Sequence, residues 1–215
     1  ITVDNAISFT ELNTLINTYN VNIDNLTFTL SASSNDLLLN SNATKVSKAS
    51  AIEVTDSTSI TRLDAIQTAA KSGVELNSGI TYTGVTDSAS VLTTTDVDTK
   101  AKLANKVLTF NENATAAQFR AALLNDGTGS VVGAVVDTTR ADLLSGAGAA
   151  LTGATSITYK VQSNDEDLTG LTFEEGVQPV DFDLNSKTGV LMKVAQADNK
   201  TITKTGNGTY TIKDT

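Results

Sequence analysis

One short phrase recurs along this chain of 215 residues at nearly constant intervals. It is a strand-like run in which β-branched or aromatic residues alternate with small polar ones, usually followed by Asp or Asn. The runs occupy positions 1–4, 26–30, 52–56, 80–87, 107–111, 132–137, 157–161 and 209–214. With starts counted at 1, 27, 52, 80, 107, 132 and 157, the steps are 26, 25, 28, 27, 25 and 25, and the step to 209 is 52. Self-similarity at a period of about 20–50 residues indicates a repeat architecture.

Helix start signals stand between these runs. Ser8-Phe9-Thr10-Glu11 and Thr115-Ala116-Ala117-Gln118 both have the capping-box pattern, and apolar residues at helical spacing follow each. Gly127 closes the second of these helices. The sequence also predicts a helix that begins at Ser59 and ends at Gly73, a helix at 143–151 opened by Thr139 and Asp142, and a short helical turn at 87–92.

The repeating unit is therefore a strand, a tight turn, a helix and a loop. Successive parallel strands need a crossover connection, and a helix inside a period of about 26 residues supplies one. We predict an α/β fold for residues 1–171, in which strand–helix repeats stack as a solenoid. The sequence lacks the leucine-rich Asn/Cys signature, so the solenoid is not of that family. A closed or doubly wound α/β sheet is the main alternative.

Residues 172–206 interrupt the recurrence. The runs 180–184 and 190–194 are separated by a loop that contains Gly189, which predicts a β-hairpin, and Pro179 precedes the first run. We expect a β-rich insertion at 172–206 and the start of a further repeat at 207–215. Because the chain opens and stops inside strand-like runs, we expect it to be a segment of a longer protein.

Composition excludes several classes of function. The chain has no Cys, no His and no Trp, which removes disulfides, thiolate nucleophiles and the Ser-His-Asp triad. Its net charge of −9 disfavours nucleic acid and anionic lipid as partners. It has no apolar run of about 18 residues, so we expect no membrane span. Paired carboxylates could indicate a glycosidase, but only 5% of residues are aromatic, so few rings can stack on a sugar, and we expect no enzyme.

Carboxylates gather where the strand-like runs end, and they are the candidate metal ligands. In a parallel solenoid, Asp56, Asp87 and Asp137 would lie along one edge, where a ladder of oxygens suits calcium. Denser acidic groups at 96–98, 164–167 and 174–175 offer the same chemistry, as does a pair that alternates on a strand at 181 and 183. The alternatives are that Asp caps the following helix and turns the chain, or that the groups form a solvated acidic surface. The further candidate calcium ligands in these groups are Asp165, Asp167, Asp181 and Asp183.

The stretch Thr81-Tyr82-Thr83-Gly84-Val85-Thr86-Asp87-Ser88-Ala89-Ser90-Val91-Leu92 resembles the "TYxVxDTAxxL" repeats of very large secreted bacterial proteins of adhesin and surface-layer type. Residues 157–168 and 209–215 are similar to it. The resemblance implies a repetitive extracellular role, with export by type I secretion, and it transfers no catalytic residue. The chain departs from the calcium-binding members because it contains no Gly-Gly-x-Gly-x-Asp nonapeptide.

These features predict a non-catalytic structural segment of an extracellular bacterial surface or filament protein, which self-associates into a filament or layer or acts as a spacer. The alternatives are a calcium-dependent adhesin module that binds a glycan or cell surface, and an outer domain of a flagellin or phage fibre. Calcium is the one cofactor that the sequence suggests.

Overall fold

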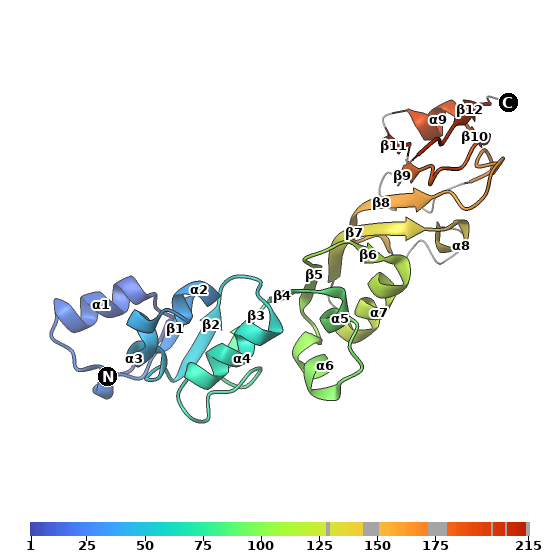
Figure 1. The fold of residues 1–215 in the computed structure, drawn as a ribbon. Helices are drawn as coiled ribbons and strands as arrows, with labels where there is room; N and C mark the ends of the chain where they lie inside the picture. The colour runs from blue at the N-terminus through green and yellow to red at the C-terminus, as the bar shows by residue number, and fades with distance from the viewer. Residues whose placement is uncertain (128–129, 144–150, 172–179, 199, 205, 214–215) are drawn as a thin grey trace. The chain divides into compact units, whose positions relative to one another are not determined.

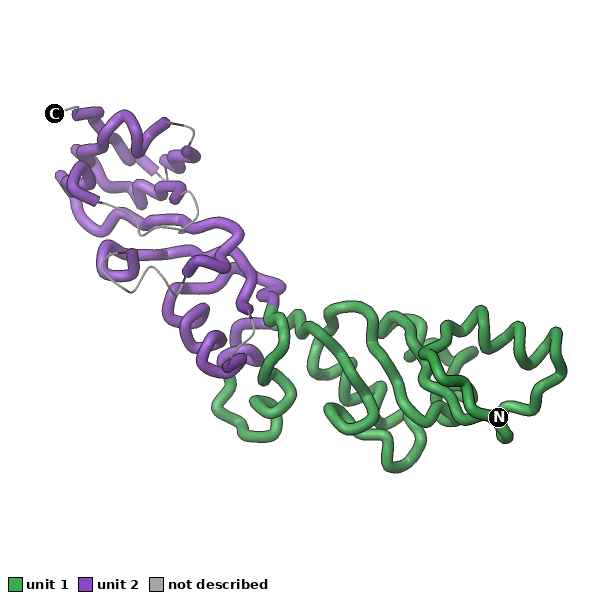
Figure 2. The backbone as a smooth tube through the Cα atoms, turned by 180° about the vertical axis from the view of Figure 1, so that it is seen from behind, with its two compact units in different colours: residues 1–87, 94–108 green, residues 88–93, 109–215 purple. Residues whose placement is uncertain are grey.

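The computed structural model describes residues 1–127, 130–143, 151–171, 180–198, 200–204 and 206–213 (Figure 1). The chain forms two compact units, coloured separately in Figure 2. Unit 1 comprises residues 1–87 and 94–108, and unit 2 comprises residues 88–93 and 109–215. The predicted insertion at 172–206 and the segment 207–215 both belong to unit 2.

Unit 1 contains short strands that alternate with helices (Figure 1). Its α-helices are α1 (Phe9–Asn17), α2 (Ser34–Leu37), α3 (Ala43–Val46), α4 (Ile60–Ala69) and α6 (Val97–Leu103). Two 3₁₀ turns are η1 (Ile23–Asn25) and η2 (Asn40–Asn42). Its strands are β1 (Thr29–Ala32), β2 (Ala51–Val54), β3 (Ile80–Tyr82) and β4 (Gly84–Asp87), and β5 (Val107–Phe110) begins in it.

The strands of unit 1 pair in parallel. β1, β2 and β3 form one sheet in chain order, in which Leu30 pairs with Ile52 and Ile52 pairs with Ile80. Isolated parallel bridges extend the same arrangement on both sides of β2, and they join Thr2 to Thr27, Ile7 to Leu30 and Thr58 to Val85.

The core of unit 1 is mainly aliphatic. Inward-facing residues of the strands alternate with exposed or half-buried ones, as expected for strands with one buried face. They pack with buried residues of the helices. The core includes Leu12, Phe28, Leu30, Ile52, Leu63, Ile66 and Ile80.

Unit 2 has longer strands in its first half. Its helices are α5 (Ala89–Leu92), α7 (Ala116–Asp126), α8 (Arg140–Leu143) and α9 (Val194–Ala197). Its strands are β6 (Ala114–Thr115), β7 (Ser130–Thr138), β8 (Ala154–Lys160), β9 (Val180–Asp183), β10 (Val190–Met192), β11 (Ile202–Thr203) and β12 (Tyr210–Ile212). The described pairs are again parallel, in the order β7, β8, β9, β11, while β6 pairs with β7 and β10 pairs with β12.

Pairing in unit 2 advances along the chain as it does in unit 1. Val135 pairs with Ile157, and Ile157 pairs with Val180. Further on, β9 pairs with β11, and β10 pairs with β12. In both units a strand therefore pairs with a strand further along the chain, 22 or 28 residues on in unit 1 and about 20–23 residues on in unit 2.

Aromatic rings contribute strongly to the core of unit 2. Phe110 stacks on Phe119 at 5.9 Å between ring centroids, and the Tyr159 and Phe182 rings lie 6.0 Å apart. Such ring pairs add attraction beyond the area that they bury.

The two predicted capping boxes are confirmed. α1 begins behind Ser8 with a complete capping box to Glu11, and α7 begins behind Thr115 with a complete box to Gln118. Gly127, at a φ of +82°, ends α7 as predicted.

The other predicted helices are present with shifted ends. α4 begins behind Ser59 as predicted but ends at Ala69, before Gly73. The short turn predicted at 87–92 is α5. At the start of the helix predicted at 143–151 the structure has α8, Arg140–Leu143, and residues 144–150 of the prediction lie outside the described part.

The predicted β-hairpin is wrong. Both runs form strands, but β9 pairs in parallel with β8 and β11, whereas β10 pairs in parallel with β12. Between them the chain passes through Asn185, Ser186 and Gly189 at positive φ. These turns carry the chain from one sheet into a second, so β9 and β10 each pair with a strand further along the chain and not with each other.

Both units combine helices with parallel strands. The class that this fold defines is therefore mixed α/β with parallel sheets, as predicted.

Candidate functional site

The carboxylate of Asp56 lies at the start of a helix that comes earlier in the chain. Asp56 follows β2 by two residues, and its oxygens accept hydrogen bonds from the backbone N–H and the hydroxyl of Ser34, at 2.6 and 2.7 Å. Ser34 is the first residue of α2 and is buried. The first N–H groups of a helix have no partner within the helix. Asp56 therefore completes the N-terminus of a helix whose first residue lies 22 residues before it.

Two further carboxylates are placed in the same way. Asp87, the last residue of β4, accepts a hydrogen bond of 3.0 Å from the N–H of Ile60, which begins α4 and lies 27 residues earlier. Glu112, two residues after β5, accepts one of 2.8 Å from the N–H of Ala89, which begins α5 and lies 23 residues earlier. Hydrogen bonds to an ionised acceptor are among the stronger ones in proteins. Each carboxylate thus fastens the end of one strand to the start of an earlier helix.

The capping interpretation needs one correction, which concerns the helix that is contacted. The sequence pattern suggests that these Asp residues cap the helix that follows them. In the structure the helix after Asp56 is capped by Ser59, whose side chain accepts a hydrogen bond from the N–H of Arg62, while Asp56 serves α2. Glu112 is not singled out by the sequence analysis, although it follows a strand-like run as Asp56 and Asp87 do.

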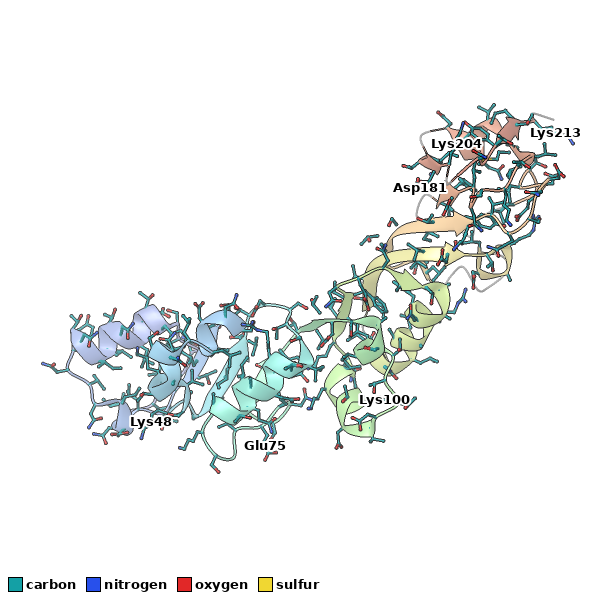
Figure 3. The ribbon with its side chains drawn as sticks, viewed as in Figure 1. Lys48, Glu75, Lys100, Asp181, Lys204 and Lys213 are labelled. Carbon is teal, nitrogen blue, oxygen red and sulfur yellow. The ribbon has the colours of Figure 1, made fainter. Side chains whose placement is uncertain are left out.

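Two other predicted calcium ligands interact with a neighbouring strand or loop. Asp137, which has a φ of +56°, forms an ion pair of 3.0 Å with Lys160. Asp181, labelled in Figure 3, accepts a hydrogen bond of 2.8 Å from the backbone N–H of Thr201. Both contacts join consecutive stretches of the chain, as the strand pairs do.

Asp167 and Asp183 each accept a hydrogen bond from the backbone two residues further on. The donors are Thr169 at 2.9 Å and Asn185 at 2.8 Å. The Thr169 hydroxyl also donates to Asp167, at 2.6 Å, and the side-chain and backbone hydrogen bonds from Thr169 lower the pKa of Asp167. This is the local turn geometry that Asp side chains favour.

The structure does not bring the seven predicted ligands together. Asp165, the last of them, lies with its carboxylate against Gly189, whose missing Cβ leaves the room for it. In the described ranges of the chain, no group of three or more His, Cys, Asp or Glu side chains is arranged to hold a metal ion. The calcium site therefore stays a prediction.

Side-chain amides form a second kind of contact between distant stretches, which the sequence analysis does not single out. Asn125 donates to the carbonyl of Leu92 at 2.9 Å, and Gln196 donates to the carbonyl of Leu168 at 2.5 Å. Asn125 and Gln196 are both buried. Because Asn is abundant throughout the sequence, nothing marks these amides in advance.

A shallow hollow of about 210 Å³ lies beside β2 and β3 in unit 1. Tyr82 contributes to its wall, but the Tyr82 hydroxyl donates to the carbonyl of Lys102 at 2.8 Å, and the Lys106 ammonium lies 4.2 Å from the centre of its ring. The small volume is poorly suited to a typical small-molecule site, which is larger. Its lining residues are Glu53, Val54, Thr55, Thr81, Tyr82 and Thr83.

Comparisons of this chain with family models, with curated proteins and with solved structures gave no match. Across the described residues, no helix combines the length and the apolar character that crossing a membrane requires.

Proposed function

We propose that this chain is a non-catalytic structural segment of an extracellular bacterial surface or filament protein, built as a solenoid of strand–helix repeats of about 26 residues. Its role is mechanical: the segment lengthens the protein, acts as a spacer within it, or assembles with other copies into a filament or layer. In such an array each repeat covers the apolar face of its neighbour, so cohesion between consecutive repeats is the property on which the function depends.

The observation that carries the proposal is the pairing of each strand with the next stretch of chain. The described pairs β1–β2, β2–β3, β7–β8, β8–β9, β9–β11 and β10–β12 are all parallel. Their partners are separated by about 20–28 residues, within the range of known strand–helix repeats. A solenoid requires this pattern, because every turn of the chain must return in the same direction. A doubly wound sheet would instead reverse its strand order at one point.

Helix starts support the same period. The N-cap residues Ser8, Ser33, Ser59, Ser88 and Thr115 stand at steps of 25, 26, 29 and 27 along the sequence. The carboxylates of Asp56, Asp87 and Glu112 then connect the starts of three helices to later strand ends. Three contacts of one kind at one repeat position are expected in an array of equivalent units.

The extracellular part of the proposal rests on the resemblance to bacterial surface repeats and on composition. The absence of Cys and the net charge of −9 fit a soluble, non-reactive spacer. The adhesin alternative receives less support, because six of the seven proposed calcium ligands accept hydrogen bonds from the protein or form an ion pair with it.

Deletion of one repeat tests the architecture. Removing residues 33–58 takes out one full repeat and joins β1 directly to the N-cap Ser59. A solenoid tolerates this change, because each repeat contacts only its neighbours. We expect the variant to keep its far-ultraviolet circular dichroism and a cooperative urea transition.

The control removes half a repeat, residues 33–45, which joins β1 to the last residue of α3 and puts the units on either side out of register. We expect this variant to lose cooperative unfolding. If both deletions unfold the chain equally, the solenoid proposal fails.

Electron microscopy of the purified chain tests the assembly role. We expect filaments or ordered arrays that persist after chelation of calcium. Arrays that dissolve on chelation would favour the calcium-dependent adhesin, and dispersed particles in both conditions would contradict assembly.

A further inference from the structure

One turn of unit 2 contains the run Gly206-Asn207-Gly208, between β11 and β12. It stacks on the turn that connects β9 to β10. The Thr209 N–H donates to the carbonyl of Lys187 at 3.0 Å, and the Gly189 N–H donates to the Thr209 hydroxyl at 3.1 Å. The two turns are therefore in direct contact.

This contact requires both glycines of the run. A Cβ added to Gly208 would lie 2.7 Å from the Cβ of the buried Leu184, and one added to Gly206 would lie 2.5 Å from the hydroxyl oxygen of Ser186. Both distances are shorter than van der Waals contact allows. Gly206 also has a φ of +62°, which favours glycine. The packing of one turn on the other therefore places a glycine on each side of Asn207.

The side chain of Asn207 is accessible. Asn207 is exposed, and its amide has no hydrogen-bond partner among the residues that the structure describes. The residues level with it in the two preceding turns are Lys187 and Ser163. They are half-buried and exposed, respectively, although a later turn lies beside each. Accessibility is therefore a property of this side of the stacked turns.

Asn207 differs from the other asparagines of the chain in one further respect, because it is the one that glycine follows. Serine follows Asn40, Asn77 and Asn185. Asn77 and Asn185 each donate the side-chain amide to a backbone carbonyl, at 3.3 and 3.1 Å. Asn207 thus combines an exposed, unheld amide with a following residue that has no side chain.

We propose that Asn207 is a site at which the chain modifies itself. The backbone nitrogen of Gly208 attacks the side-chain carbonyl carbon of Asn207 and forms a C–N bond. The side-chain nitrogen leaves as ammonia, which takes up the proton of the Gly208 N–H, and a cyclic succinimide remains. Water then adds to either ring carbonyl and opens the ring, which leaves aspartate or isoaspartate at position 207.

The structure favours both steps. The nitrogen of glycine reaches backbone conformations that are closed to residues with a Cβ, so Gly208 approaches the Asn207 side chain with little steric cost. The exposed position admits the water that opens the ring. Because Gly208 packs against Leu184, no residue with a side chain can replace this glycine without a shift of the core.

The isoaspartate product alters the contact between the two turns. It adds one carbon atom to the backbone between positions 207 and 208, whereas Gly208 has little room to move against Leu184. The carbonyl of Thr209 accepts from the Val190 N–H at 3.2 Å, and this bond begins the pairing of β10 with β12. The longer connection displaces Thr209 and loosens β12 from β10. The chain thus weakens one of its own strand contacts with time, whether or not copies assemble.

Peptide mapping tests the reaction. The folded chain is kept in mildly alkaline buffer and then digested with trypsin, which cuts after Lys204 and Lys213 and releases peptide 205–213. Mass spectrometry should show that an amide nitrogen of this peptide is replaced by oxygen, and electron-transfer fragmentation should locate isoaspartate at position 207. We expect conversion about tenfold faster than at Asn40, which is also exposed but is followed by Ser. Equal rates at the two sites would overturn the proposed site.

Hydrogen exchange on the aged chain tests the consequence. The Val190 and Thr209 amides should lose protection in proportion to the isoaspartate that has formed. The matched variant is Asn207→Gln, which keeps an exposed amide on a side chain too long to close the same ring, and it should show neither the mass change nor the loss. Freshly prepared Asn207→Asp, which adds the charge without the extra backbone carbon, should keep full protection.

An aged chain that contains isoaspartate but keeps full protection of these two amides would overturn the effect on β12. An equal loss of protection in Asn207→Gln after the same incubation would overturn it as well.

Discussion

Unit 1 and unit 2 support the same parallel pairing by different means. In unit 1 the strands β1 to β4 are three or four residues long, and two helices of nine and ten residues flank them. In unit 2 β7 and β8 have nine and seven residues, while α8 and α9 have four each. Unit 2 also contains α7, with eleven residues, so the clear difference between the units is the length of β7 and β8 and not the length of their helices.

The cores of the two units differ in their aromatic content. Unit 1 fills its interior mainly with Leu, Ile and Val and fixes two helix starts through Asp56 and Asp87, whereas unit 2 fixes one helix start in this way, through Glu112. Unit 2 stacks Phe110 on Phe119 and brings the Tyr159 and Phe182 rings together. The comparison indicates that carboxylate contacts hold helix starts to later strands in both units and that aromatic pairs add to the cohesion of unit 2.

The largest expected effect comes from breaking an aromatic pair in unit 2. Phe119→Ala removes a side chain with no exposed surface, which costs about 3–5 kcal/mol of unfolding free energy. Leu63→Ala in unit 1, equally buried, should cost about 2–5 kcal/mol. Hydrogen exchange should place the loss of protection in α7 and β7 for the first variant and around α4 for the second. Identical exchange patterns for both would show that the units unfold as one.

The second-largest loss of stability is expected from removing a carboxylate contact of unit 1. Asp56→Ala leaves the backbone N–H and the hydroxyl of Ser34 without their acceptor, and Ser34 is buried, so we expect a loss of about 1–3 kcal/mol in urea unfolding.

The control for that variant is Asp64→Ala. It removes an ion pair with Lys102 whose Asp64 side chain is 50% exposed, and such pairs contribute about 0–1 kcal/mol. Equal losses of unfolding free energy for the two variants would mean that the contact of Asp56 with the start of α2 stabilises unit 1 no more than an exposed ion pair does.

Much of the secondary structure could be predicted because its signals are local. The capping boxes at Ser8 and Thr115 each lie within four residues, and both helices begin where these boxes place them. The helix α6 was missed: Val97 is 77% exposed and Leu103 is its one buried residue, so no apolar stripe marks it. Its start signal is Asp96, which accepts from the N–H of Thr99 at 2.8 Å.

What the sequence could not supply is the choice of partner between distant stretches. The runs at 180–184 and 190–194 satisfy every local rule for a hairpin, yet each pairs with a strand further along the chain. Likewise, Asp56 and Asp87 were recognised as strand-end carboxylates, but their donors lie 22 and 27 residues earlier. Every residue except proline carries a backbone N–H, so the residue types in a sequence do not reveal which N–H will be the donor.

Acid titration gives the smallest effect and sharpens the contrast between a half-buried carboxylate in unit 2 and an exposed one in unit 1. Burial raises the pKa of Asp142, but hydrogen bonds from Arg120 and Thr139 outweigh it, so the pKa lies below its ordinary value. A carboxylate whose pKa is lower in the folded chain adds stability above its unfolded pKa of about 3.9 and loses it as the pH falls through the folded value. Hydrogen bonds from Thr99 lower the pKa of the exposed Asp96 in the same direction.

The corresponding variants are Asp142→Asn and Asp96→Asn. Asp142→Asn should cost up to about 1 kcal/mol at a pH of about 6, and the difference from the unmodified chain should vanish as the pH falls well below about 4, because both chains then carry a neutral group. Asp96→Asn should follow the same course with a smaller amplitude, since water screens its charge. Urea unfolding at a series of pH values from about 2 to about 7 measures both differences. If the difference in unfolding free energy between Asp142→Asn and the unmodified chain persisted at the acid end, the shape of the Asp142 side chain and not its charge would stabilise α8.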